Sequence, residues 1–141
     1  MNRHRVAALA ATLAVLVAIA LGFWNLGGPA RQREVSADLK RSDDLRRISI
    51  VINQWYRRDK SLPPDLNAIT RYDPGLRLRD PLTNASYEYK PAADSNYQLC
   101  ATFALDSAVE GLHEPEPPIF SYHRAGRRCF DLDALHGRLY R

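Results

Sequence analysis

The sequence contains few of the residues from which catalytic and metal centres are built. Among its 141 residues are only two cysteines and four histidines. The histidines are His4, His113, His123 and His136, and they lack the i, i+4 or clustered spacing of a zinc site. There is no Gly-rich phosphate loop, Gly-x-Ser-x-Gly elbow or Cys-x-x-Cys pair. We therefore expect no catalytic activity, and a hydrolase that pairs Cys129 with His123 is the weakest alternative.

A large excess of basic charge is also missing from most of the chain. Only Arg3 and Arg5, of 20 Lys and Arg residues, precede the first long apolar run, and all 16 Asp and Glu residues follow it, so the remainder carries +2. This near balance disfavours nucleic acid as a partner, although the whole-chain pI is high. The arginine pairs are expected to be solvated, and Arg31 and Arg33, beside the apolar run, are a minor candidate contact with anionic lipid.

The apolar run is the strongest single pattern. Val6 to Trp24 is nineteen residues without a charge. At about 1.5 Å rise per residue, a helix of this length spans roughly the 30 Å of a bilayer core. We predict a basic tail over residues 1–5 and a lipid-embedded transmembrane helix over 6–26. A cleaved signal peptide is the alternative, but its apolar region is typically only about 7–15 residues.

The flanking charges and the cysteines together predict an orientation. Arg3 and Arg5 favour an amino terminus on the cytoplasmic side of the cytoplasmic (inner) membrane. A linker over 27–33 then leads to one periplasmic domain over 34–141. Cys100 and Cys129 both lie in that domain, where an even pair is typical of one disulfide. The alternative is two reduced, buried thiols in a cytoplasmic domain.

Periodicity predicts an α+β domain in which one long amphipathic helix packs on a small antiparallel sheet. The helix is expected over about 35–58. Its apolar stripe consists of Leu45, Ile48, Val51, Ile52, Trp55 and Tyr56. Ser42-Asp43-Asp44 matches a helix cap, so a kink or break near Ser42 is an open alternative. A short helical turn is expected over 65–69 after Pro63 and Pro64.

The strands are predicted from alternation. Tyr87 to Lys90 and Tyr97 to Leu105 alternate with period two and are separated by polar turn residues, as in an antiparallel hairpin. Further strands are expected at 119–122 and 128–132, with Gly126 as the turn between them. Cys100 meets Cys129 if the last strand pairs alongside the hairpin.

Three segments resemble the major pseudopilins of type II secretion systems. "DLRRISIVINQWYRRDKSLPPDLNAI" (Asp44–Ile69) is similar to their helix and the Leu-Pro-x-x-Leu segment that follows it. "DPLTNASYEYKP" (Asp80–Pro91) resembles their Asp-Pro-Trp-Gly-x-x-Tyr-x-Tyr turn and strand, and "YQLCATFA" (Tyr97–Ala104) resembles the next strand. The likeness covers about half of the chain. It is confined to the C-terminal domain, because "MNRHR" stands where that family has its processing motif.

A second likeness concerns the tail of the domain. "HRAGRRCFDL" (His123–Leu132), together with "YQLCATF", is similar to bacterial single-pass membrane proteins that have no assigned activity. The first resemblance implies a structural or interaction protein of an envelope complex with a pseudopilin-like domain. The alternative is an envelope ligand-binding or sensory module that recognises a glycan or calcium through residues 80–96.

Two sets of candidate site residues follow. The pseudopilin resemblance implies calcium binding in this loop region, and the oxygen ligands that Ca²⁺ prefers are available there. The candidate ligands are Asp80, Asn84, Glu88 and Asp94. The candidate interaction residues are Tyr87, Tyr89 and Tyr97, whose rings suit stacking on a sugar. The alternative for the tyrosines is packing over the helix as core.

Overall fold

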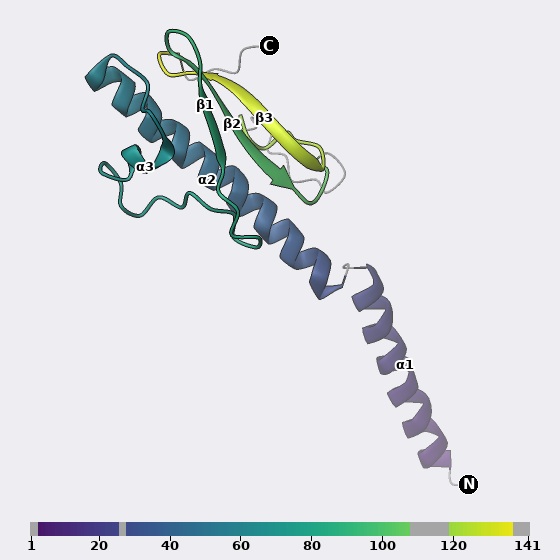
Figure 1. Ribbon diagram of the computed structural model, residues 1–141. Helices are drawn as coiled ribbons and strands as arrows, with labels where there is room; N and C mark the ends of the chain where they lie inside the picture. The colour runs from purple at the N-terminus through teal and green to yellow at the C-terminus, as the bar shows by residue number, and fades with distance from the viewer. Residues whose placement is uncertain (1–2, 26–27, 108–118, 137–141) are drawn as a thin grey trace. The chain divides into compact units, whose positions relative to one another are not determined.

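The computed structural model describes residues 3–25, 28–107 and 119–136, and its elements are labelled in Figure 1. Three helices precede three strands. They are α1 (Arg3–Asn25), α2 (Pro29–Asp59), α3 (Leu66–Ile69), β1 (Glu88–Pro91), β2 (Asn96–Phe103) and β3 (Gly126–Asp133). The chain divides into two compact units, one ending at Arg33 and the other beginning at Glu34.

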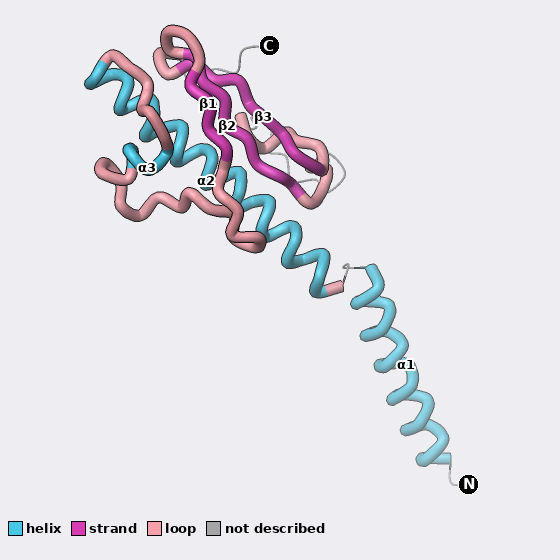
Figure 2. The backbone as a smooth tube through the Cα atoms, in the orientation of Figure 1, coloured by secondary structure: helices cyan, strands magenta, loops and turns pink. Residues whose placement is uncertain are grey.

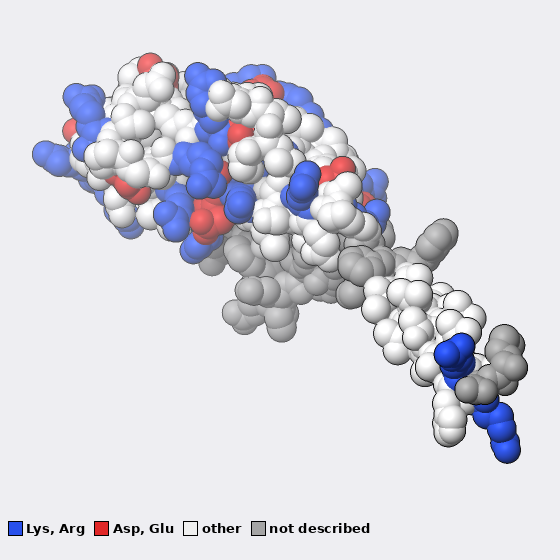
Figure 3. Space-filling model, turned by 90° about the horizontal axis from the view of Figure 1, so that it is seen from below, with Lys and Arg blue, Asp and Glu red and all other residues white. Residues whose placement is uncertain are grey.

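The first unit contains α1, an apolar helix. Its leucine and valine side chains are largely exposed, for example Leu9 at 67% and Leu13 at 63%. Within it, Arg3–Gly22 is long and apolar enough to cross a membrane, a test that a signal sequence also passes. Along α1, Lys and Arg side chains are seen at one end only (Figure 3), where Arg3 and Arg5 lie.

Helix α2 is longer than the sequence pattern suggested. It begins at Pro29, so residues 29–33 of the expected linker are helical. It also continues through Ser42 without a break. Asp43 and Asp44 do not cap a second helix, because Asp43 pairs with Arg46 and Arg47 while Asp44 turns inward.

The predicted apolar stripe of α2 is confirmed. Its buried members are Leu45, Ile48, Val51, Ile52 and Trp55. They form one core with residues of the sheet and of α3, including Tyr97, Leu99, Phe103 and Ile69. Their burial at steps of three and four residues is the geometry by which one face of a helix packs on a sheet.

The sheet is antiparallel with the strand order β1-β2-β3, drawn in magenta in Figure 2. Tyr89 lies opposite Leu99, and Leu99 lies opposite Phe130. These residues share the face that packs on α2, as the alternation along a strand requires. The predicted α+β class and the hairpin of β1 and β2 are therefore confirmed.

Two predictions about the third strand need correction. Residues 119–122 form no strand, because Phe120 is buried at 2% exposure and its ring packs edge-to-face on Phe130 with centroids 4.9 Å apart. Its carbonyl oxygen accepts a hydrogen bond from Ser42 Oγ. Gly126 is the first residue of β3, and its φ of 93° explains the glycine there.

Cys100 and Cys129 are bonded to each other. They are directly opposite in the β2–β3 register, with Cα atoms 4.0 Å apart. By alternation they lie on the sheet face away from α2, together with two cross-strand polar contacts. In these contacts Arg127 pairs with Glu88 at 2.6 Å, and Gln98 donates to Asp131 at 2.8 Å.

Candidate functional site

Three charged residues continue the buried face of α2 toward its N-terminal half. Asp38, Arg41 and Asp44 are exposed by only 0%, 3% and 5%. They follow one another at steps of three, so they extend the stripe that Leu45 begins. Their burial is not predicted by composition, because charged side chains are rarely buried unless they are paired. The i, i+3 spacing in line with Leu45 was the signal available.

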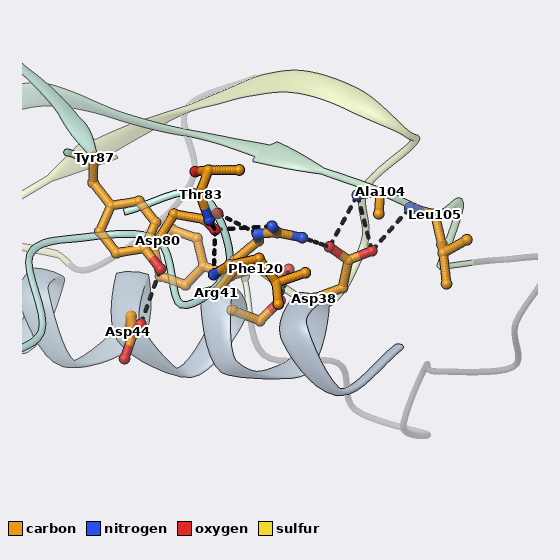
Figure 4. A network of polar contacts seen from close by, with 11 residues as sticks. Asp38, Arg41, Asp44, Asp80, Thr83, Tyr87, Ala104, Leu105 and Phe120 are labelled. Carbon is orange, nitrogen blue, oxygen red and sulfur yellow. Dashed lines mark hydrogen bonds and ion pairs between the residues drawn. The ribbon is translucent and has the colours of Figure 1, made fainter. Parts of the chain in front are cut away.

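Arg41 is the centre of this buried cluster (Figure 4). Its Nη1 lies 2.5 Å from Asp38 Oδ1. Its Nε and Nη2 donate to the two carboxylate oxygens of Asp80 at 2.5 and 3.0 Å, which is a bidentate pairing. One guanidinium therefore joins two carboxylates that are 42 positions apart in the chain, one on the helix and one in the Asp80-Pro81 turn.

The two carboxylates also accept hydrogen bonds from backbone amides. Asp38 accepts hydrogen bonds from the amides of Ala104 at 3.0 Å and Leu105 at 2.8 Å, just after β2. Asp80 accepts from the amides of Leu82 and Thr83, both at 2.8 Å. The network thus fixes α2, the end of β2 and the turn before β1 to one another.

A second polar contact lies next along the helix. Tyr87 Oη donates to Asp44 Oδ2 at 2.9 Å, and both side chains are buried. Burial raises the pKa of the Asp44 carboxyl and outweighs the opposing hydrogen bond from Tyr87. Burial and the hydrogen bond to Asp44 raise the pKa of the Tyr87 hydroxyl. Tyr87 therefore stays a neutral donor at physiological pH.

The charge of Asp80 is strongly favoured in the folded chain. Burial by itself raises the pKa of this carboxyl, but the hydrogen bonds from Arg41, Thr83 and Leu82 outweigh it and lower the pKa to about 2. The pKa of the Arg41 guanidinium is raised, because its hydrogen bonds to Asp80 and Asp38 outweigh its own burial. The pair is ionised over the whole physiological range.

Acid is expected to weaken the domain through Asp80. The folded-state pKa of about 2 lies below the ordinary value of 3.8, so the ionised carboxylate favours the folded chain. This contribution is complete above the ordinary pKa, declines as the pH falls through it, and is gone below about 2. The urea midpoint of the wild type should therefore fall more steeply with acidification than that of Asp80→Asn. Parallel pH profiles would contradict the assignment.

The three candidate interaction tyrosines face the core. Tyr87 and Tyr97 are buried and Tyr89 is half-buried. Each hydroxyl has a hydrogen-bond acceptor: Asp44 for Tyr87, the carbonyl of Pro63 for Tyr89, and Asn53 for Tyr97. Stacking on a sugar needs an exposed ring face, so the burial of Tyr87 and Tyr97 favours core packing, the alternative considered for this set.

The four candidate calcium ligands are spread over separate contacts. Asp80 is paired with Arg41, and Glu88 is paired with Arg127 on the sheet face that carries the disulfide. Asn84 and Asp94 adopt positive φ in two different turns. Within residues 3–25, 28–107 and 119–136, no group of three or more His, Cys, Asp or Glu side chains is arranged to hold a metal ion. Calcium binding remains a prediction from the resemblance.

His123 lies apart from this network, over the end of β2. Its ring stacks on Phe103 with centroids 3.6 Å apart, and its backbone N–H donates to Ser107 Oγ. Burial lowers the pKa of the imidazole. Cys129 has no thiol to serve beside it as a nucleophile, because its sulfur is bonded to Cys100. His123 is therefore part of the packing around Phe103.

A groove runs along the outer side of the Asp80 turn. One hollow of about 710 Å³ is lined by Asn67, Leu76, Arg77, Leu78, Arg79, Asp80, Pro81 and Asn84. A second hollow of about 300 Å³ is lined by Pro64, Asp65, Leu66, Asn67, Leu78, Arg79, Ser86, Tyr87 and Tyr89. Asn67, Leu78 and Arg79 belong to both, so the two hollows adjoin. The buried network lies directly behind this surface, through Asp80.

Comparisons with protein-family models, with curated proteins and with solved structures gave no match. The resemblance to pseudopilins therefore stays a prediction from the sequence.

Proposed function

We propose that this chain is a single-pass, membrane-anchored structural or interaction protein of the bacterial cell envelope, without catalytic activity. Its amino terminus lies on the cytoplasmic side of the inner membrane, and residues 34–141 lie on the periplasmic side. The observation that carries the proposal is α1, whose apolar side chains are exposed along a helix of membrane-spanning length.

Two further observations support the placement. A helix with leucines exposed by more than half, such as Leu9 and Leu21, is costly in water, and lipid removes that cost. The Cys100–Cys129 bond suits an oxidising compartment outside the cytoplasm. Arg3 and Arg5 precede the helix and match the preference of basic residues for the cytoplasmic side.

An interaction role is consistent with the way in which the buried polar groups of the domain are used, since they hold its elements together. Asp38, Arg41 and Asp80 fix the turn to the helix, and the tyrosine hydroxyls fix the hairpin to its surroundings. The adjoining hollows beside the Asp80 turn offer a surface that a partner could contact. A pseudopilin-like component of an envelope complex is the role that we propose for it.

Cysteine labelling of the full-length chain tests the placement. In intact spheroplasts, a membrane-impermeant maleimide should label Cys129, the less buried of the two cysteines, only after an impermeant reductant has been added. The reason is that, in the proposed topology, both sulfur atoms lie on the periplasmic side of the membrane, and they are bonded to each other. A matched control replaces both with serine and carries Asn2→Cys, and it should be labelled only after lysis.

Three results would contradict the proposal. Labelling without reductant and only after lysis would place the domain in the cytoplasm. Labelling of Asn2→Cys in intact spheroplasts would reverse the orientation. A shortened chain released in soluble form, instead of a full-length chain that stays with membranes after an alkaline wash, would identify α1 as a cleaved signal.

A further inference from the structure

The disulfide joins two strands that differ in what lies beside them. Cys100 is on β2, the central strand, and Cys129 is on β3, at one edge of the sheet (Figure 2). Within the described residues, β3 pairs with β2 alone. Cys100 is exposed by only 1%, whereas Cys129 is partly exposed. The two sulfur atoms are therefore not equally accessible to a reagent from solution.

The side of Cys100 that faces away from Cys129 is covered by an ion pair. Glu88 of β1 lies directly opposite Cys100 in the register. Arg127 of β3 reaches across β2, and its Nε and Nη2 donate to the Glu88 carboxylate at 2.7 and 2.6 Å. The same Nη2 lies 3.7 Å from Cys100 Sγ. The pair thus stands over Cys100 on the side from which a reagent would arrive past β1.

A hollow of about 500 Å³ adjoins Cys129 instead. Its lining includes Arg128, Cys129 and Phe130, three consecutive residues of β3. Consecutive strand residues point to opposite faces, so a hollow that all three line lies along the edge of the strand. The rest of its lining is Asp106, Tyr122, His123 and Arg124. With two arginines and one aspartate, this edge carries an excess of basic charge.

The direction of thiol–disulfide exchange makes this difference chemically relevant. The incoming thiolate attacks one sulfur in line, from the side opposite to the other sulfur, and the other sulfur leaves as a thiolate. Attack on Cys129 therefore comes from the edge of β3 away from β2, where the hollow lies. Attack on Cys100 comes from the side of β1, where Glu88 and Arg127 are paired.

We propose that Cys129 is a site of thiol–disulfide exchange with an external thiolate that carries carboxylates. A bond forms between the incoming sulfur and Cys129 Sγ, and the Cys100–Cys129 bond breaks. Its electron pair leaves with the Cys100 sulfur, which is reduced and takes a proton from water, while the incoming sulfur is oxidised. Arg127 Nη2 is placed to stabilise the departing thiolate. Arg124 and Arg128 attract the carboxylates of the incoming thiol.

Trapping of the mixed disulfide on the full-length wild type in detergent tests this inference. The probe is reduced glutathione, a tripeptide thiol that carries carboxylates. The reaction is stopped with acid, free thiols are alkylated in denaturant, and mass spectrometry of the digest locates both modifications. At least about nine tenths of the adduct should be on Cys129, with the alkyl group on Cys100. An adduct mainly on Cys100, or divided equally between the two, would overturn the proposal.

Matched single-cysteine variants measure the same asymmetry without the return reaction. Cys100→Ser keeps the thiol of Cys129 and Cys129→Ser keeps that of Cys100, and both lack the cross-link. Oxidised glutathione should modify Cys100→Ser at least about tenfold faster than Cys129→Ser in native buffer, and equally fast in denaturant. Equal rates in native buffer would contradict the assignment. If circular dichroism shows either variant unfolded, the trapping on the wild type decides.

The covering ion pair has its own test. Glu88→Ala with Arg127→Ala uncovers Cys100, so the share of the adduct on Cys100 should rise at least about threefold. The matched control is Asp43→Ala with Arg46→Ala, which removes an exposed ion pair of α2, and its adduct should be distributed as in the wild type. An unchanged distribution in the Glu88 and Arg127 variant would mean that the pair does not direct the attack.

The charge of the hollow is tested by comparing two thiols. Arg124→Gln with Arg128→Gln should slow exchange with glutathione about threefold or more, and exchange with neutral 2-mercaptoethanol by less than about twofold. Equal slowing of both thiols would overturn the selection of carboxylates by this edge. All of these measurements use purified protein, so they are independent of the membrane placement and of its labelling test.

Discussion

Replacing Arg41 with methionine is expected to destabilise the domain by about 3–5 kcal/mol, the usual cost of breaking a buried ion pair from one side. Asp38 and Asp80 would both remain in the interior, at 0% and 8% exposure, with no cation between them. Domains of ordinary size have about 5–15 kcal/mol of total stability, so this change removes a large part of it. Urea unfolding of the full-length chain in detergent, followed by circular dichroism, measures the loss.

A surface ion pair of the same helix is the matched control. Arg46 and Asp43 are separated by 2.7 Å, but their side chains are 52% and 41% exposed. Arg46→Met should therefore cost about 0–1 kcal/mol, because water already solvates both charges. Equal losses for Arg41→Met and Arg46→Met would show that burial of the network contributes nothing.

Removing the stranded charges should restore part of the stability. A triple variant combines Arg41→Met with Asp38→Asn and Asp80→Asn. The side-chain carbonyls of the two asparagines can still accept the hydrogen bonds that backbone amides donate to Asp38 and Asp80 in the wild type. The uncompensated negative charges are gone. The triple variant should therefore be more stable than Arg41→Met alone. A triple variant no more stable than Arg41→Met would show that the stranded charges of Asp38 and Asp80 do not cause the loss.

The sequence was sufficient for the parts of the fold that depend on apolar periodicity. The stripe from Leu45 to Trp55 and the alternation in β2 both reflect burial of one face, which gives a periodic pattern of apolar residues. The disulfide was predicted from the even number of cysteines in one domain. The error at 119–122 has a physical cause. Phe120 is buried, and its carbonyl oxygen accepts a hydrogen bond from Ser42 Oγ. The short apolar run therefore packs into the core and does not pair with a neighbouring strand.

The partners within the polar part of the core were not predicted from the sequence. Asp38 and Arg41 look like ordinary residues of a solvated helix face, because their partner Asp80 is about 40 positions away. Asp80 itself was expected to be a turn residue or a calcium ligand. It does form the turn, and its second function, pairing with Arg41, depends on a tertiary contact that spacing does not encode.

Removing the Cys100–Cys129 bond is expected to lower the free energy of unfolding by about 3–4 kcal/mol. The two residues are 29 positions apart, and a cross-link over a loop of that length restricts the unfolded chain by about this amount in the loop-entropy model. The comparison is between the wild type and Cys100→Ala with Cys129→Ala, by urea unfolding without reductant. Reductant should bring the wild type to the midpoint of the variant.

The neighbouring cross-strand pair separates the cross-link from ordinary sheet contacts. Gln98 and Asp131 lie opposite each other on the same face at 2.8 Å, and Gln98→Ala with Asp131→Ala should cost only about 0.2–1 kcal/mol. Because the β2–β3 register also depends on Leu99, Phe130 and their packing on α2, the cysteine variant should keep the native sheet. A native fold with an unchanged midpoint would mean that the unfolded chain is already restricted without the bond. A midpoint that falls in the alanine variant but not in reductant would instead assign the loss to packing of the sulfur atoms.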